Sequence, residues 1–248
     1  QFAKIIPGTY AIADYGRYVE GFRAYDKSGN ALSVSMTDSN TWVISNATTL
    51  ARLTYLVNDT YDTEAGDAFT EGSKTIFSPA GINILEGKQF MLNMCGFVGY
   101  FNDKANITYK LNINHPENLQ ASSSLDDADP AKGSDVFVVT RYAEMVDHPI
   151  MYAAPDIASA RIGSMDLILS IYSPRNKNIS TNVFMPDLGK MIRAQKAYLG
   201  NINNTKKYAV LTYISTNAKD DARGFAALEH NTSTTSVFAE NMKTKDLI

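Results

Sequence analysis

The chain has 248 residues, of which 44% are apolar and 20% charged, so it can form one large or two ordinary domains with packed cores. Its formal net charge is −3 and its pI is about 5.6, which excludes the basic stripe of a nucleic-acid-binding protein. The sequence contains no run of about 18 apolar residues, so it predicts no transmembrane segment. A basic start followed by an apolar stretch, the pattern of a signal peptide, is not found in the sequence.

Short β-type segments dominate the first 145 residues. They are rich in aromatic and β-branched residues or alternate with a period of two, and they cover residues 18–26, 31–36, 41–45, 51–59, 89–101 and 107–113. Turns of Gly, Asn, Asp and Ser separate them about every ten residues. This spacing predicts an antiparallel β-sandwich, and no long helix is expected before residue 180.

The pattern changes after about residue 145. Residues 165–173 and 206–215 are predicted strands, and 186–200 carries a helical apolar face that ends at Gly200. That face consists of Leu188, Met191, Ile192, Gln195, Tyr198 and Leu199. The helix is expected to extend back toward Ser180. Strand, helix and strand in this order predict a mixed α/β unit. We therefore expect two domains, residues 1–145 and 146–248.

Few side chains in the chain carry catalytic signals. The single cysteine, Cys95, lies in an apolar stretch and is expected to be buried and inert. The acidic segment 120–135 lacks the alternating spacing of a calcium loop, so a solvated loop is expected there. The sequence contains no phosphate-binding loop, dinucleotide fingerprint or nucleophile elbow.

The three histidines lack the spacing of metal ligands. His115 precedes Pro116 and is predicted to be a surface turn residue, whereas His148 is given a structural role at the domain junction. His230 directly follows Glu229, in a stretch from Gly224 to Phe238 that is expected to form one exposed or edge strand. From spacing alone, Glu229 is an exposed carboxylate on that strand. The sequence predicts no metal ion and no cofactor in this segment.

Several stretches, in this order, resemble one known family. They are "IIPGTYAIADYGRYVEGFRAYDKSGNALSV" (5–34), "SDVFVVTRYAEMVDHPIMY" (134–152), "KAYLGN" (196–201), "KKYAVLTYIS" (206–215) and "AALEHNTS" (226–233). Together they resemble the glycyl aminopeptidase family of zinc metallopeptidases, thermolysin-like enzymes that often carry a PDZ domain. The second stretch contains the family's Val-Asp-x-Pro-Ile, and the last is similar to its Gly-x-Leu-Glu-His. The resemblance covers nearly the whole chain.

This resemblance implies a substrate-binding role for the last stretch. In the family the strand binds a peptide as an added β-strand, and its Glu receives the free α-amine of the substrate. The implied substrate-binding residues are therefore Glu229 as amine anchor, Ala226 and Ala227 through their backbone, and His230 in the same motif. The sequence departs from the family at Ala226, where Gly is usual, and the added methyl group narrows the expected cleft.

The resemblance also implies that the zinc-binding part of the family's catalytic domain is missing from this sequence. No H-E-x-x-H motif is present, so we expect an N-terminal fragment: most of a β-sandwich and the front of a thermolysin-like catalytic domain. Zinc is expected only in the full-length protein, with a peptide as substrate and no nucleic acid as partner. The family's usual setting favours export in a bacterium, and the sequence carries no signal for an oligomeric state. Two other interpretations stay open, a non-catalytic β-sandwich binding or surface module and a degenerate peptidase homologue.

Overall fold

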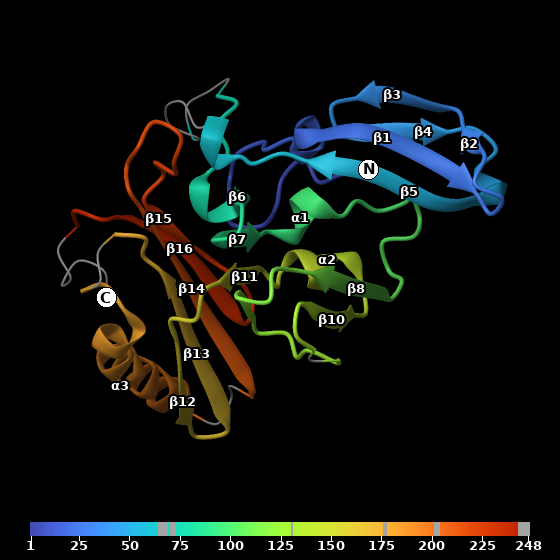
Figure 1. The fold of residues 1–248 in the computed structure, drawn as a ribbon. Coiled ribbons are helices and arrows are strands. Elements are labelled where there is room, and N and C mark those ends of the chain that lie inside the picture. Colours follow the sequence, from blue (N-terminus) through green and yellow to red (C-terminus); the bar gives the residue numbers. More distant parts are fainter. Residues whose placement is uncertain (64–68, 70–72, 130, 176–177, 201–203, 243–248) are drawn as a thin grey trace.

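The computed structural model describes residues 1–63, 69, 73–129, 131–175, 178–200 and 204–242. Figure 1 shows two groups of antiparallel strands followed by a five-stranded sheet with one long helix beside it. The expected mainly β fold, with an α/β part after the antiparallel strands, is confirmed. No helix in the described ranges is long and apolar enough to cross a membrane.

The first group of strands forms a three-stranded sheet and a hairpin. Its elements are η1 (Tyr15–Tyr18), β1 (Val19–Asp26), β2 (Ala31–Leu32), β3 (Val34–Asp38), β4 (Thr41–Ile44), η2 (Ala47–Thr49) and β5 (Leu50–Val57). The sheet order is β2-β1-β5, and β3 pairs with β4. Phe22 of β1 stacks on Trp42 and Tyr55, with ring centroids 4.8 and 5.7 Å apart. These stacked rings hold the hairpin against the sheet.

The second group contains a four-stranded sheet and a two-stranded ribbon. Its elements are η3 (Tyr61–Thr63), η4 (Ser78–Ala80), β6 (Asn83–Leu85), β7 (Gln89–Leu92), α1 (Met94–Phe97), β8 (Tyr109–Asn114), β9 (Gln120–Ser122), β10 (Ser134–Val139), α2 (Tyr142–Val146) and β11 (Ile150–Ala153). The sheet order is β6-β7-β11-β9, and β8 pairs with β10. The predicted domain boundary at residue 145 lies just before β11, the last strand of this group, and stays a prediction.

The predicted strand over residues 89–101 is wrong after Leu92. The buried Asn93 interrupts it, because its side-chain amide donates to the carbonyls of Pro79 at 3.1 Å and Gly81 at 2.6 Å. The helix α1 follows and buries Cys95 completely. The predicted burial of Cys95 is confirmed, and burial raises the pKa of its thiol to about 12.

His115 is not the predicted surface turn residue. Its side chain is only 7% exposed, and its Nε2 lies 3.1 Å from a carboxylate oxygen of Asp135. The ring packs on Tyr152, whose hydroxyl donates to Asp135 at 2.6 Å. Burial raises the pKa of Asp135. The sequence concealed this cluster because its three members come from separate parts of the chain.

The last part of the chain forms a mixed sheet. Its elements are β12 (Ile157–Ile162), β13 (Met165–Tyr172), α3 (Thr181–Leu199), β14 (Lys207–Ser215), β15 (Ala226–Glu229) and β16 (Ser233–Ala239). The order is β12-β13-β14-β16-β15; β13, β14 and β16 run parallel, whereas β12 and β15 are antiparallel to their neighbours. The helix α3 packs on β12 and β13. Apolar residues on the opposite face, among them Leu211, Tyr213 and Val237, pack in one cluster with Met91 and Met151 of the four-stranded sheet.

The long helix begins and ends as the sequence predicts. Asp156 caps it, because its carboxylate accepts the amide of Thr181 at 3.1 Å and the hydroxyl of Thr181 at 2.7 Å. Gly200 ends it with φ at +65°, a left-handed conformation that favours glycine. The predicted apolar face is only partly covered, since Tyr198 is 91% and Leu199 47% exposed.

The single strand expected over residues 224–238 is instead a hairpin. β15 and β16 are joined by a tight turn, and only β15 lies at the sheet edge. β16 lies between β14 and β15, and most of its residues are buried. The sequence does not predict this burial, because the run of Thr and Ser in β16 is polar. Thr235 donates its hydroxyl to the carbonyl of Pro79 at 2.7 Å, whereas the buried hydroxyl of Ser233 has no partner among the described residues.

Asp59 gives the fold a predictable pH dependence. Its carboxylate accepts the amides of Tyr61 and Ile84, but burial raises its pKa from 3.8 to about 6. The native state therefore binds this proton more tightly than the unfolded state does, so stability rises as pH falls from 7 to about 5. We expect Asp59 to contribute about 1.3 kcal/mol to that rise. Urea unfolding at pH 5 and pH 7 measures it.

The control for this prediction is a pair of variants. Asp59→Asn should abolish most of the extra stability at pH 5, because the amide does not titrate in this range. Asp103→Asn, at an exposed position, should leave the pH dependence as in the wild type. An unchanged pH dependence in Asp59→Asn would contradict the prediction.

Candidate functional site

The strand β15 carries an exposed carboxylate at the edge of the five-stranded sheet. β15 pairs only with β16 among the described strands, so its outer side is open. Glu229 is exposed at the end of this strand. Among the residues that the structure describes, none forms a hydrogen bond or ion pair with the Glu229 carboxylate. A carboxylate free in this way can receive a cationic group from a ligand.

The backbone of β15 directs alternate residues to its two sides. The amide of His230, just after the strand, donates to the carbonyl of Ser233 at 2.8 Å and so faces β16. Because this direction alternates along an antiparallel pair, the backbone groups of Leu228 also face β16. Those of Ala227 and Glu229 point to the open edge. An extended peptide can pair with such groups.

The two alanines of β15 lie on different sides. Ala227 is exposed and lines an apolar cavity of about 290 Å³ between α3 and the sheet. Ala226 is half-buried, and by the same alternation its backbone groups face β16. Of the residues predicted from sequence, Ala227 and Glu229 thus share the open edge and Ala226 lies behind it.

The opposite face of β15 packs on the N-terminal strand groups. Leu228 is only 2% exposed and belongs to the core cluster of the N-terminal part. It fills the space beside Gly8, where a Cβ atom would lie 2.7 Å from Leu228 Cδ1. Before the strand, the Gly224 amide donates to the Ser78 hydroxyl at 2.7 Å. These contacts with the N-terminal part therefore fix the position of β15.

A buried carboxylate arranges the loop that leads into β15. Asp221 accepts the hydroxyl of Tyr213 at 2.8 Å, and it accepts both the amide and the hydroxyl of Thr216 at 2.8 Å. It also accepts the amide of Ala222 at 2.8 Å. These contacts tie the loop to β14, the neighbour of β16. No pattern in the sequence predicts this role of Asp221.

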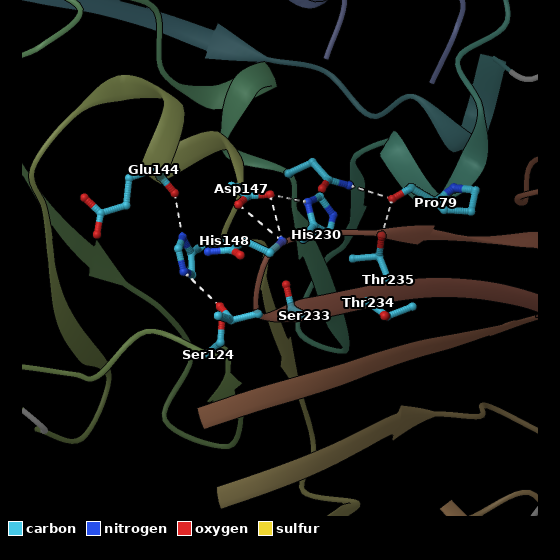
Figure 2. Close-up of polar contacts among 12 residues, drawn as sticks. Pro79, Ser124, Glu144, Asp147, His148, His230, Ser233, Thr234 and Thr235 are labelled. Carbon is cyan, nitrogen blue, oxygen red and sulfur yellow. Dashed lines mark hydrogen bonds and ion pairs between the residues drawn. The ribbon is translucent and has the colours of Figure 1, made fainter. Parts of the chain in front are cut away.

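His230 has a different environment from Glu229. Its side chain is only 4% exposed, and its Nδ1 lies 3.5 Å from a carboxylate oxygen of Asp147 (Figure 2). Within the described part of the chain, its Nε2 has no hydrogen-bond partner. The structure therefore separates the two residues that the sequence places side by side. Glu229 faces solvent, and the ring of His230 faces the N-terminal part.

The turn after Glu229 is held by the segment that follows α2. The Asn231 amide donates to both carboxylate oxygens of Asp147, each at 3.2 Å. The Thr232 hydroxyl lies 3.0 Å from Nε2 of His148, whose Nδ1 lies 2.6 Å from the Glu144 carbonyl. Figure 2 shows this row of contacts across the junction. These contacts agree with the structural role predicted for His148, which stays a prediction.

The charge of Asp147 fits these contacts. Partial burial by itself raises the pKa of this carboxyl, but the His230 ring and the Asn231 amide outweigh it and lower the pKa. Asp147 is therefore ionised at neutral pH. In the sequence Asp147 belongs to the Val-Asp-x-Pro-Ile stretch, which by itself predicts no role for its carboxylate. The only available signal was that both stretches belong to the same family pattern.

No metal centre is present among the described residues. They contain no group of three or more His, Cys, Asp or Glu side chains placed to hold a metal ion. The strand β15 presents an unpaired carboxylate, outward backbone groups and an adjacent apolar cavity.

Comparison with known proteins shows the family to which the chain belongs. No curated protein matches the chain. The family model of the peptidase M61 N-terminal domain matches residues 1–154, more than half of the chain. The chain belongs to the peptidase M61 family. The resemblance to metallopeptidases is thereby confirmed at the level of the family, and this M61 chain contains the N-terminal domain.

The fold of the M61 chain is similar to that of a larger peptidase-related protein. An aminopeptidase N family protein from Idiomarina loihiensis matches with a TM-score of 0.78 at 19% identity, over 100% of this chain and 38% of that one. An M1 zinc metallopeptidase from Deinococcus radiodurans has a TM-score of 0.44 at 14% identity, over 87% of this chain and 50% of that one. The M61 chain thus spans half or less of either protein.

Proposed function

We propose that the protein carrying this chain is a zinc-dependent peptidase of aminopeptidase type, in which β15 binds the N-terminal end of a peptide. The observation that carries this proposal is the exposed, unpaired Glu229 carboxylate at the end of an open strand edge. Membership of the M61 family supports a peptidase. The likeness to glycyl aminopeptidases, through "AALEHNTS", supports the aminopeptidase type.

The proposed binding follows from the geometry of β15. The substrate backbone pairs with the outward groups of Ala227 and Glu229, extending the sheet by one strand. The Glu229 carboxylate then receives the free α-amine in a charge-assisted hydrogen bond. The small side chain of Ala227 lets the peptide approach closely. In this scheme Ala226 and His230 serve the site indirectly, by pairing with β16 and by contacting Asp147.

In this proposal zinc is bound by residues other than the described ones. The described residues contain no ligand set for it, so its ligands lie outside the described part of this chain. Bound zinc supplies the Lewis acid for hydrolysis of the first peptide bond. What the described residues contribute is orientation of the substrate, because an anchored amine places that bond at a fixed distance from the strand.

Glu229→Gln tests the amine anchor. In the full-length protein it should lower kcat/KM for a free-amine peptide about 10- to 150-fold, which corresponds to roughly 1.5–3 kcal/mol. The inhibition constant of the N-acetylated form of the same peptide should hardly change, because that peptide has no charged amine. Both quantities are measured by steady-state kinetics with the free-amine peptide as substrate.

The control is Glu117→Gln, which removes an exposed carboxylate from a loop in the N-terminal part. It should change neither quantity. If Glu229→Gln weakens the free-amine and the N-acetylated peptide equally, or affects neither, Glu229 is not the amine anchor and the proposal fails.

A further inference from the structure

Two distant segments of the chain meet at the turn that follows Glu229. Asp147 and His148 lie 83 or 84 positions before the turn residues that they contact. Three consecutive turn residues, His230, Asn231 and Thr232, each contact this segment. The contacts come from both side chains and backbone, so they restrain the position and the orientation of the turn.

The turn needs such restraint because β15 is short and has one neighbour. It has four residues and pairs only with β16 among the described strands. Leu228 fixes the middle of the strand through its buried side chain. Glu229 is the last residue of the strand and is exposed. The turn that begins at the next residue is what restrains Glu229 from its C-terminal side.

Asp147 makes the central contacts of this turn. Both of its carboxylate oxygens accept the single amide of Asn231, and one of them faces the buried ring of His230. The ring is 4% exposed, so water cannot readily replace the carboxylate beside Nδ1. A neutral side chain of the same shape retains one acceptor for Asn231 and removes the charge.

We propose that Asp147 is a positioning residue for substrate binding, which acts by holding the His230–Thr232 turn and thereby fixes the Glu229 carboxylate at the open edge of β15. This proposal rests on the proposed function, in which Glu229 receives the substrate amine. Asp147 itself touches no substrate. Its effect must therefore depend on Glu229 and on a free amine, whereas a general loss of structure would depend on neither.

The test is a double-mutant cycle in the full-length protein with Asp147→Asn, Glu229→Gln and both together. Asp147→Asn should lower kcat/KM for a free-amine peptide about 5- to 10-fold in the wild-type background. In the Glu229→Gln background it should lower kcat/KM less than 2-fold. The inhibition constant of the N-acetylated peptide should stay within 2-fold in all proteins.

Glu144→Gln is the matched control. It removes a negative charge from α2, and its carboxylate contacts Thr140 instead of the turn. The backbone carbonyl of Glu144, which lies by His148, is retained. This variant should keep the wild-type kcat/KM. If its kcat/KM falls as much as that of Asp147→Asn, the effect of Asp147→Asn comes from the loss of a charge at long range and the proposal fails.

Hydrogen exchange gives a readout besides activity. The amide of Asn231 should exchange at least tenfold faster in Asp147→Asn, whereas the amides of β14 should exchange as in the wild type. Equal acceleration in β14 would make Asp147 a general structural residue and overturn the proposal. Equal losses for free-amine and N-acetylated peptides, or full additivity with Glu229→Gln, would overturn it while leaving the amine anchor intact. Failure of Glu229→Gln alone to discriminate the peptides overturns both proposals.

Discussion

Replacing Leu228 with alanine is expected to destabilise the folded chain by about 2–5 kcal/mol. Leu228 is 2% exposed and joins the edge strand to the core of the N-terminal part. Its removal leaves a cavity beside Gly8, because a Cβ atom on Gly8 would lie 2.7 Å from Leu228 Cδ1. The midpoint of urea unfolding, followed by intrinsic fluorescence, measures the loss.

Leu228→Ala should also weaken substrate binding if β15 is the binding strand, because the strand then loses its contact from behind. The control is Leu56→Ala in β5, where the side chain is 69% exposed. That variant should change the free energy of unfolding by no more than about 0.5 kcal/mol. Equal effects of the two substitutions would show that Leu228 does not anchor the edge strand.

Gly16→Ala is expected to destabilise the chain by at least about 3 kcal/mol, because the added methyl group meets backbone on the opposite side. A Cβ atom on Gly16 would lie 2.3 Å from the carbonyl oxygen of Ser39 and 2.6 Å from Cα of Asn40. Relief of this overlap requires separation of two segments. It also breaks the buried hydrogen bond from the Gly16 amide to Oδ1 of Asn40, now 2.9 Å long.

Gly189 provides a control of opposite sign. It lies inside α3, where the nearest atoms to an added Cβ are those of the Arg193 side chain, at 3.5 Å. Gly189→Ala should therefore stabilise the chain by about 0.5–1 kcal/mol through helix propensity. Thermal unfolding of both variants checks the pair of signs, and a neutral or stabilising Gly16→Ala would refute the predicted overlap.

Local patterns in the sequence determined most of the secondary structure. The strands β1, β5, β13 and β14 lie where alternation or apolar runs predict them, and α3 ends at Leu199 before Gly200. These features are readable because a strand period, a helical face or a glycine stop depends on neighbours in the sequence. The exposed position of Glu229 belongs here too, since its motif predicted an edge strand.

Long-range contacts decided the rest. The sequence could not show that β16 lies inside the sheet and parallel to β14, because its Ser and Thr residues look like a surface strand. It could not show that His115 is buried beside Asp135, or that Asp147 holds the turn after Glu229. In each case the deciding partner comes from a distant segment, and periodicity carries no information about which distant carboxylate meets a given amide or ring. The sequence by itself determined the candidate binding strand, and only the tertiary structure determined what fixes it in place.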